Sequence, residues 1–141
     1  MSIRNAIPED CEAIRDILTQ LDYPDTDSFL LDKIKRIINQ PNSLLLVYQL
    51  DQEVVAFMAI DFITQLALHG DFARISYFAV DSAARNKRIG QQLEAYCEEV
   101  ARQKNCDRIE VHCHERRSDA LRFYKRQGYI ESPKYLIKSL R

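Results

Sequence analysis

The spacing of apolar residues changes at Leu44, and this change constrains the fold more than any other feature of the sequence. Before Leu44, apolar residues recur at steps of three and four, which predicts an amphipathic helix over 8–21 and a second helix after it. After Leu44, the stretches 44–50 and 54–64 are rich in apolar and β-branched residues, which predicts two strands. A hairpin turn at 51–52 would join them, and the chain is therefore expected to mix helices and strands in one α/β unit.

The rest of the sequence repeats both patterns without a linker or an internal repeat. We expect a mixed α/β fold of one domain, residues 1–141, with a sheet of six or seven strands flanked by four helices. Besides the segments above, the expected elements are strand 2–6, strand 72–80, helix 90–104, strand 107–113, helix 118–127, and one or two strands between 129 and 140.

Charge and hydropathy exclude several functional classes. The formal net charge is -1, so the chain lacks the strong positive field of a general nucleic-acid binder, and nucleic acid is not an expected partner. No apolar run reaches the length of about 18 residues that a membrane span needs. The first residues lead into acidic ones rather than into the apolar core of a signal peptide, so we expect a cytoplasmic protein without a membrane partner.

The four cysteines form no CxxC pair, so we expect reduced thiols rather than a disulfide framework. In the stretch His112-Cys113-His114, a strand would send the two histidines to one face and the cysteine to the other. No metal site is therefore expected.

A basic turn between strand 72–80 and the helix at Gly90 is the first candidate site. Arg85, Lys87 and Arg88 lie in this turn, where the unpaired N–H groups and the positive dipole end of the following helix attract anions. The turn is neither a P-loop nor a GxGxxG dinucleotide motif. Taken alone, it fits an anion-binding loop and a solvated basic loop equally well.

This turn and a motif farther along the chain resemble the two motifs of the GNAT superfamily of acyl-CoA-dependent N-acetyltransferases. The order of helices and strands is also similar over essentially the whole chain, which implies a GNAT-type, mostly antiparallel sheet. The family's Gln/Arg-x-x-Gly-x-Gly/Ala turn is Arg85-x-x-Arg88-x-Gly90 here, and its Ala-x-x-Phe/Leu-Tyr-x-x-x-Gly-Phe/Tyr signature is Ala120-x-x-Phe123-Tyr124-x-x-x-Gly128-Tyr129.

The resemblance implies where acetyl-CoA, the co-substrate, would bind. The backbone of Phe78, Ala79 and Val80 would pair with the pantetheine arm in a slot where two strands splay apart, with an oxyanion-binding N–H near Val80. Arg88 stands where the family turn has its middle glycine, an exchange that the turn accommodates if Arg88 keeps a negative φ. The residues implied in holding the pyrophosphate are Arg85, Asn86, Lys87, Arg88, Ile89 and Gly90.

Tyr124 resembles the general acid of the family, whose phenol can protonate the thiolate of coenzyme A as it leaves. The structural alternative is a helix tyrosine that fills the core beside Phe123. The asparagine often found three residues before the signature alanine is Arg117 here, a change that removes or relocates one hydrogen bond to the cofactor.

The general base is not assigned by the motifs. An amine with a pKa near 10.4 must lose a proton before it attacks, which costs about 4 to 5 kcal/mol at pH 7. Many relatives use a glutamate on the fourth strand, but the stretch 72–78 contains no carboxylate. His112 is the first candidate, followed by Asp61, Asp71 and His69, and each has a structural role as its alternative.

The resemblance implies transfer of an acetyl group from acetyl-CoA to a primary amine by direct attack in a ternary complex. We expect a small-molecule acceptor, because so short a chain has little beyond the core fold with which to build a peptide groove. The stretches 66–71 and 120–129 are similar to the aminoalkylphosphonate N-acetyltransferases, a small-amine branch whose fourth-strand carboxylates are absent here. The alternatives are acetylation of a protein, peptide or aminoacyl-tRNA, and a non-catalytic acyl-CoA-binding module; a homodimer is an open option for the assembly.

Overall fold

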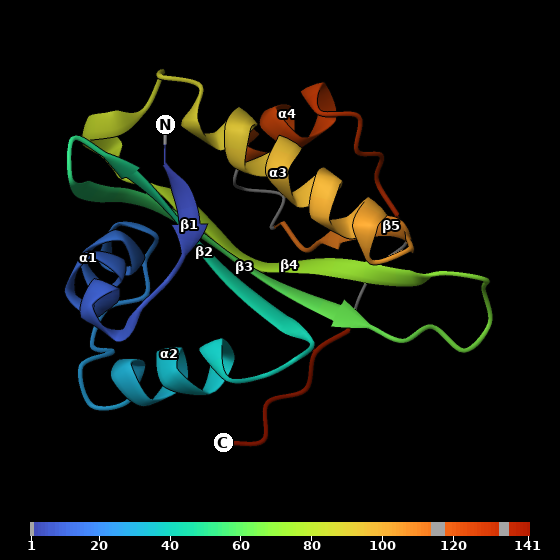
Figure 1. The fold of residues 1–141 in the computed structure, drawn as a ribbon, viewed down its shortest axis with the longest axis horizontal. Coiled ribbons are helices and arrows are strands. Elements are labelled where there is room, and N and C mark those ends of the chain that lie inside the picture. Colours follow the sequence, from blue (N-terminus) through green and yellow to red (C-terminus); the bar gives the residue numbers. More distant parts are fainter. Residues whose placement is uncertain (1, 114–117, 133–135) are drawn as a thin grey trace.

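The computed structural model describes residues 2–113, 118–132 and 136–141, and it shows one twisted sheet between two layers of helices (Figure 1). Within these residues the sheet has five strands in the order of the sequence. Neighbouring strands are antiparallel except the last pair, which is parallel. The strands are β1 (Ile3–Asn5), β2 (Ser43–Leu50), β3 (Glu53–Ile63), β4 (Asp71–Val80) and β5 (Cys106–Val111).

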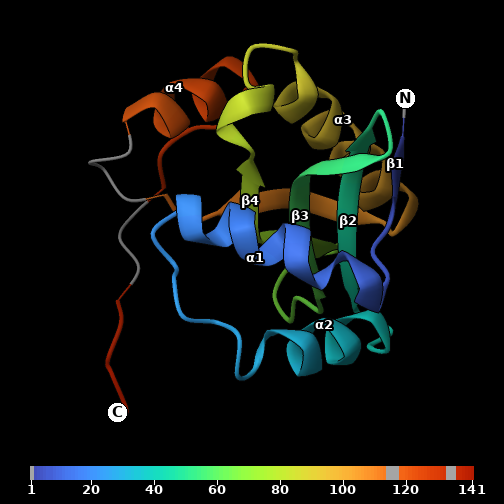
Figure 2. The same ribbon diagram turned by 90° about the vertical axis from the view of Figure 1, so that its left-hand side faces the viewer.

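Two helices cover each face of the sheet (Figures 1 and 2). Helices α1 (Cys11–Gln20) and α2 (Leu30–Ile38) lie on one face, and α3 (Ile89–Gln103) and α4 (Ser118–Arg126) lie on the other. Short 3-10 turns, Pro8–Asp10 and Ser82–Ala84, precede α1 and α3. No helix in the described part of the chain has the length and apolar character needed to cross a membrane.

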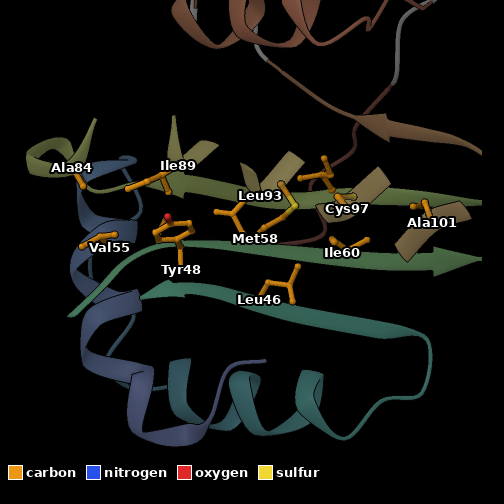
Figure 3. Packing of buried hydrophobic residues seen from close by; sticks show 13 residues of the cluster. Leu46, Tyr48, Val55, Met58, Ile60, Ala84, Ile89, Leu93, Cys97 and Ala101 are labelled. Carbon is orange, nitrogen blue, oxygen red and sulfur yellow. The ribbon is translucent and has the colours of Figure 1, made fainter. Parts of the chain in front are cut away.

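The strands bury both of their faces, because helices cover the sheet on each side. On β2, Leu46 belongs to the cluster that packs under α3, together with Leu93 and Cys97 (Figure 3). The next residue, Val47, belongs to the cluster under α1 and α2, which includes Ile17. All five side chains are at most 1% exposed, and burial of this kind contributes about 1.5 to 3 kcal/mol for each large apolar side chain.

The predicted hairpin between β2 and β3 is confirmed. Asp51 and Gln52 form its turn, with φ of 50° and 69°. Positive φ at both central residues is the geometry that suits the right-handed twist of two paired strands. The hairpin pairs β2 with β3, and β3 pairs in turn with β4, which carries the candidate site.

The prediction of six or seven strands is wrong for the described residues, because the segment after α4 forms none. Residues 129–132 and 136–141 join no ladder of the sheet. The side chains of Ile130, Leu136 and Ile137 are 85 to 93% exposed. Their apolar pattern suggested a strand, but a strand also needs a partner edge, and local sequence does not show whether one is within reach.

Gly70 lets the chain pass close to the start of β5. Its N–H donates to Asp107 Oδ2 at 2.8 Å, and a Cβ at this position would stand 2.5 Å from the backbone oxygen of Asn105. Contacts this short require the backbone to move. Gly70 therefore sets how the beginnings of β4 and β5 come together.

We predict that Gly70→Ala lowers the free energy of unfolding by about 1 to 3 kcal/mol, because the new methyl group overlaps backbone of the next strand. Urea denaturation measures this difference. The control is Leu68→Ala in the same loop, where a half-exposed side chain is truncated with an expected change within about 0.5 kcal/mol. Equal stability of the two variants would contradict the steric argument.

Candidate active site

The parallel pairing of β4 with β5 stops halfway along β4. The last pair in the register is Ile75 with Val111, the residue at which β5 ends. From there to Val80, β4 is paired with β3 alone. One edge of β4 over 76–80 therefore has no strand partner among the described residues, which agrees with the predicted splay of two neighbouring strands.

A β-bulge lies at the point where the two strands part. The register places Tyr77 opposite Ala59 and Ile75 opposite Ile60, so Ser76 is the extra residue of β4. The Ser76 hydroxyl donates to the carbonyl oxygen of Ala59 at 3.3 Å. A bulge bends its strand and redirects the residues that follow it, and this one directly follows the last residue of β4 that pairs with β5.

The condition that Arg88 keeps a negative φ is not met. Arg88 has φ 60° and ψ 21°, in the left-handed region, and Asn86 in the same turn has φ 68°. Left-handed backbone at a residue with a Cβ costs roughly 1 to 2 kcal/mol. The turn therefore demands at position 88 the conformation that the family's glycine provides, and this chain adopts it with an arginine.

The basic turn leads directly into α3, which begins at Ile89. The side chains of Arg85, Asn86, Lys87 and Arg88 are exposed, whereas that of Ile89 is only 2% exposed and anchors the start of the helix in the core. The first N–H groups of a helix have no partner within it. Cationic side chains and free N–H groups thus meet at one end of α3, which favours an anion.

Gly90, Phe78 and Phe123 bring the three predicted segments together. A Cβ on Gly90 would stand 3.6 Å from the Phe78 ring and 3.5 Å from the Phe123 ring. The two phenyl rings meet edge to face with 5.9 Å between their centroids. The unpaired part of β4, the start of α3 and the middle of α4 therefore contact one another, although they are far apart in the sequence.

Tyr124 lies at the same junction. Its ring is 6.4 Å from that of Phe78 and 5.4 Å from that of Phe123, measured between centroids, and its side chain is half-buried. Tyr124 is thus in reach of the open edge of β4 and also packs against aromatic neighbours. These contacts fit the packing role that the sequence allowed, and the chemical role stays a prediction.

The end of α4 is closed by a Schellman motif at Gly128. Gly128 has φ 97°, and its N–H donates to the carbonyl of Lys125 at 3.1 Å. The N–H of Tyr129 donates to the carbonyl of Tyr124 at 3.0 Å. This is the 6→1 and 5→2 pairing that ends a helix at a left-handed glycine.

The sequence analysis missed a buried acid on α3. Glu94 is 1% exposed, and its Oε2 accepts a hydrogen bond from the Tyr129 hydroxyl at 2.9 Å. Burial, followed by the neighbouring Glu98, raises the pKa of Glu94 to about 7. The available signal was its position, one residue from Leu93 and three from Cys97, within the apolar stripe of the helix.

A cavity of about 1180 Å³ lies between α3, β5 and α4. His112, the first candidate base, follows β5 directly and lines this cavity together with Tyr124, Tyr129 and Glu94. The structure therefore brings His112 and Tyr124 to one cavity. His112 is exposed, whereas the acid that shares the cavity is buried.

The other base candidates lie elsewhere or already hold a structural contact. Asp61 accepts a hydrogen bond from the Ser43 hydroxyl at 2.7 Å, and Asp71 accepts one from the Gln65 N–H at 3.3 Å. His69 and Asp71 lie at the start of β4, whereas the basic turn follows its other end (Figure 1). The structure does not bring these three candidates to the junction of β4, α3 and α4.

Two of the residues named from the sequence lie outside the described residues. Arg117 and His114 fall in the stretch 114–117, which the structure does not describe. Among the described residues, no group of three or more histidine, cysteine or acidic side chains could hold a metal ion.

The family model of the acetyltransferase (GNAT) family matches residues 11–129. The chain belongs to this family. It is 28% identical over 139 residues to the aminoalkylphosphonate N-acetyltransferase of Salmonella typhimurium, with 98% of this chain and 90% of the relative covered. The family match makes this chain a GNAT-family acetyltransferase.

Solved structures show the same fold. The GNAT chain superposes on a structure from Bacillus halodurans titled as a transcriptional regulator, with a TM-score of 0.90, 26% identity and 99% of both chains covered. It also superposes on an aminoglycoside N-acetyltransferase in complex with CoA, with a TM-score of 0.87 and 15% identity, over 99% of this chain and 94% of the other. At 15% identity the second likeness concerns the fold alone.

We predict that Arg88→Gly unfolds with a free energy about 1 kcal/mol higher than Arg88→Ala. Both variants remove the guanidinium, but only glycine adopts φ near 60° without strain, so the difference isolates the backbone cost. Urea denaturation of the two proteins measures it. If the alanine variant were as stable as the glycine variant, the left-handed conformation at position 88 would be wrong.

Proposed function

We propose that this chain is an acetyl-CoA-dependent N-acetyltransferase that acetylates a primary amine of a small molecule in a ternary complex. The observation that carries the proposal is the unpaired half of β4. It leads directly into the basic turn and α3, and its Phe78 packs against Tyr124. A strand edge, an anion-binding helix end and a phenol therefore lie next to one another. They match the pantetheine arm, the pyrophosphate and the thioester sulfur of an acyl-CoA.

The residues present fit acetyl-CoA in three places. The free backbone edge of Phe78, Ala79 and Val80 suits the amide groups of the pantetheine arm, which can pair with it as an added strand does. The turn from Arg85 to Gly90 offers exposed cations and helix N–H groups to the pyrophosphate. The left-handed conformation at two of its residues turns successive N–H groups toward one side, as anion-binding nests do.

Acetyl-CoA supplies the thioester that is attacked. The amine nitrogen forms a bond to the carbonyl carbon, and an N–H near Val80 would stabilise the negative charge on the oxygen. The bond from that carbon to sulfur then breaks, and Tyr124 donates its phenolic proton to the leaving sulfur. The acceptor must also lose a proton, for which His112 is retained as a candidate base because it lines the same cavity as Tyr124.

The curated relative supports a small amine as acceptor. At 28% identity, it carries a name that states acetylation of aminoalkylphosphonates, which are small amines. Proteins and aminoacyl-tRNA present amines as well, and these classes are separated by experiment.

The test is a screen for release of free thiol from acetyl-CoA in the presence of small primary amines, peptides and aminoacyl-tRNA. We expect release with small amines and N-acetylated product confirmed by mass spectrometry. Release only with peptides or aminoacyl-tRNA would move the acceptor to that class. A rise in the melting temperature with acetyl-CoA, without thiol release for any amine, would indicate a non-catalytic acyl-CoA-binding module.

We predict that Tyr124→Phe lowers kcat by about 100-fold or more, because the leaving sulfur loses its proton donor while the ring contacts remain. The KM for acetyl-CoA should change little, since the substituted group acts in the transition state. The matched control is Tyr96→Phe, which removes a phenol from the exposed side of α3 and should leave turnover unchanged. Full turnover of Tyr124→Phe at saturating amine and acetyl-CoA would disprove the acid assignment.

A further inference from the structure

Glu94 is a buried carboxylic acid on the face of α3 that otherwise carries apolar side chains. It is 1% exposed and adjoins the fully buried Leu93. A buried carboxyl is costly unless its oxygens are hydrogen-bonded. Glu94 Oε2 accepts a hydrogen bond from the Tyr129 hydroxyl, with 2.9 Å between the two oxygens. The cost of burying Glu94 is therefore offset by a contact to the segment that follows α4.

Tyr129 is in turn held against Tyr124. The Schellman motif joins its N–H to the Tyr124 carbonyl at 3.0 Å. The two rings meet edge to face, 5.3 Å apart at 63°. Both ends of Tyr129 are thereby fixed, the backbone by α4 and the hydroxyl by Glu94, and its ring forms one wall of the space in which the Tyr124 ring lies.

This contact matters because α4 is the least buried helix among the described residues. None of the described α4 residues is fully buried. Its aromatic contacts to Phe78 and its link through Tyr129 to α3 are side-chain interactions that span from α4 to the rest of the fold. A shift of about 1 Å in a reacting group can reduce the rate of catalysis by about 100-fold.

We propose that Glu94 is a positioning residue for Tyr124: its hydrogen bond to the Tyr129 hydroxyl fixes the Tyr129 ring, which orients the Tyr124 phenol. The inference rests on the proposed function, in which Tyr124 protonates the leaving thiolate. Glu94 itself contacts neither the acceptor nor acetyl-CoA in this role. Tyr129 is the last residue of the family signature, whereas Glu94 belongs to neither motif.

The ionisation of Glu94 makes this link sensitive to pH. Its pKa of about 7 results first from burial and then from Glu98, while the Tyr129 hydroxyl acts in the opposite direction. The pKa of Tyr129 is raised by burial and by Glu94, so its hydroxyl stays a donor at neutral pH. A hydrogen bond to an ionised carboxylate is about twice as strong as a neutral one, so the link tightens as the pH rises through about 7. Cys97 on α3 interacts electrostatically with Glu94. The other titratable or charged groups that line the cavity are Arg102 on α3, Cys106, Asp107, Arg108 and Glu110 on β5, His112 and Cys113 after it, Lys125 on α4, and Glu131.

The kinetic test uses Tyr129→Phe, which keeps the ring and removes only the hydroxyl. We expect kcat to fall about tenfold, with the KM for acetyl-CoA within about twofold of the wild type. Glu94→Gln should lower kcat in the same direction, and the control Glu99→Gln, an exposed acid of the same helix, should not. In a Tyr124→Phe background the Tyr129→Phe substitution should have no further effect, because the group that it positions is gone.

The spectroscopic test does not depend on turnover. In protein labelled with ¹³Cζ-tyrosine, the signals of Tyr124 and Tyr129, assigned with the two phenylalanine variants, should both shift with a midpoint near pH 7. Glu94→Gln should abolish both shifts, and Glu99→Gln should preserve them. The comparison requires folded protein. If Glu94→Gln folds poorly, Tyr129→Phe replaces it, and in that variant the Tyr124 shift should disappear.

The outcomes separate the two proposals. If Tyr124→Phe is slow but Tyr129→Phe has wild-type kcat, the positioning role is overturned and the proposed function stands. If Tyr124→Phe turns over fully, the acid assignment fails and the inference fails with it. An unchanged Tyr124 signal between pH 5 and 9 in the wild type would overturn the link itself, whatever the kinetics.

Discussion

The end of the β4–β5 ladder at Ile75 and Val111 is the constraint on which the rest of the site depends. Backbone N–H and C=O groups need hydrogen-bonding partners, and a strand that loses its neighbour offers a row of them. The bulge at Ser76 lies where this opening begins, directly after β4 has paired with β5 over its first half. Everything proposed for acetyl-CoA is arranged along the edge that results, from the strand to the turn and the start of α3.

The two halves of the core stabilise the site unequally. The sheet, α1, α2 and α3 bury large apolar side chains on both faces, so β4 and the first turn of α3 are firmly placed. Helix α4 has no fully buried residue among those described. Its position depends on aromatic contacts around Phe123 and on the hydrogen bond from Tyr129 to Glu94. The group proposed to donate a proton thus sits on the least buried helix, which explains why a buried acid on α3 matters for it.

The basic turn contains strained backbone. Two residues with side chains, Asn86 and Arg88, occupy left-handed backbone where glycine would be free of strain. Strain of this kind persists where the surrounding structure holds it, and it is concentrated at functional sites. Buried Ile89 on one side and the end of β4 on the other provide that support.

The sequence alone determined the elements up to α4, the hairpin turn at Asp51 and Gln52, and the family, because each of these depends on residues close together in the chain. It did not determine the number of strands, since pairing of the segment after α4 depends on a distant edge. It also did not determine the sign of φ at Arg88 or the burial of Glu94 against Tyr129. Those features arise only when α3, β5 and α4 are brought together, because the packing of distant segments decides which backbone is strained and which polar group is removed from water.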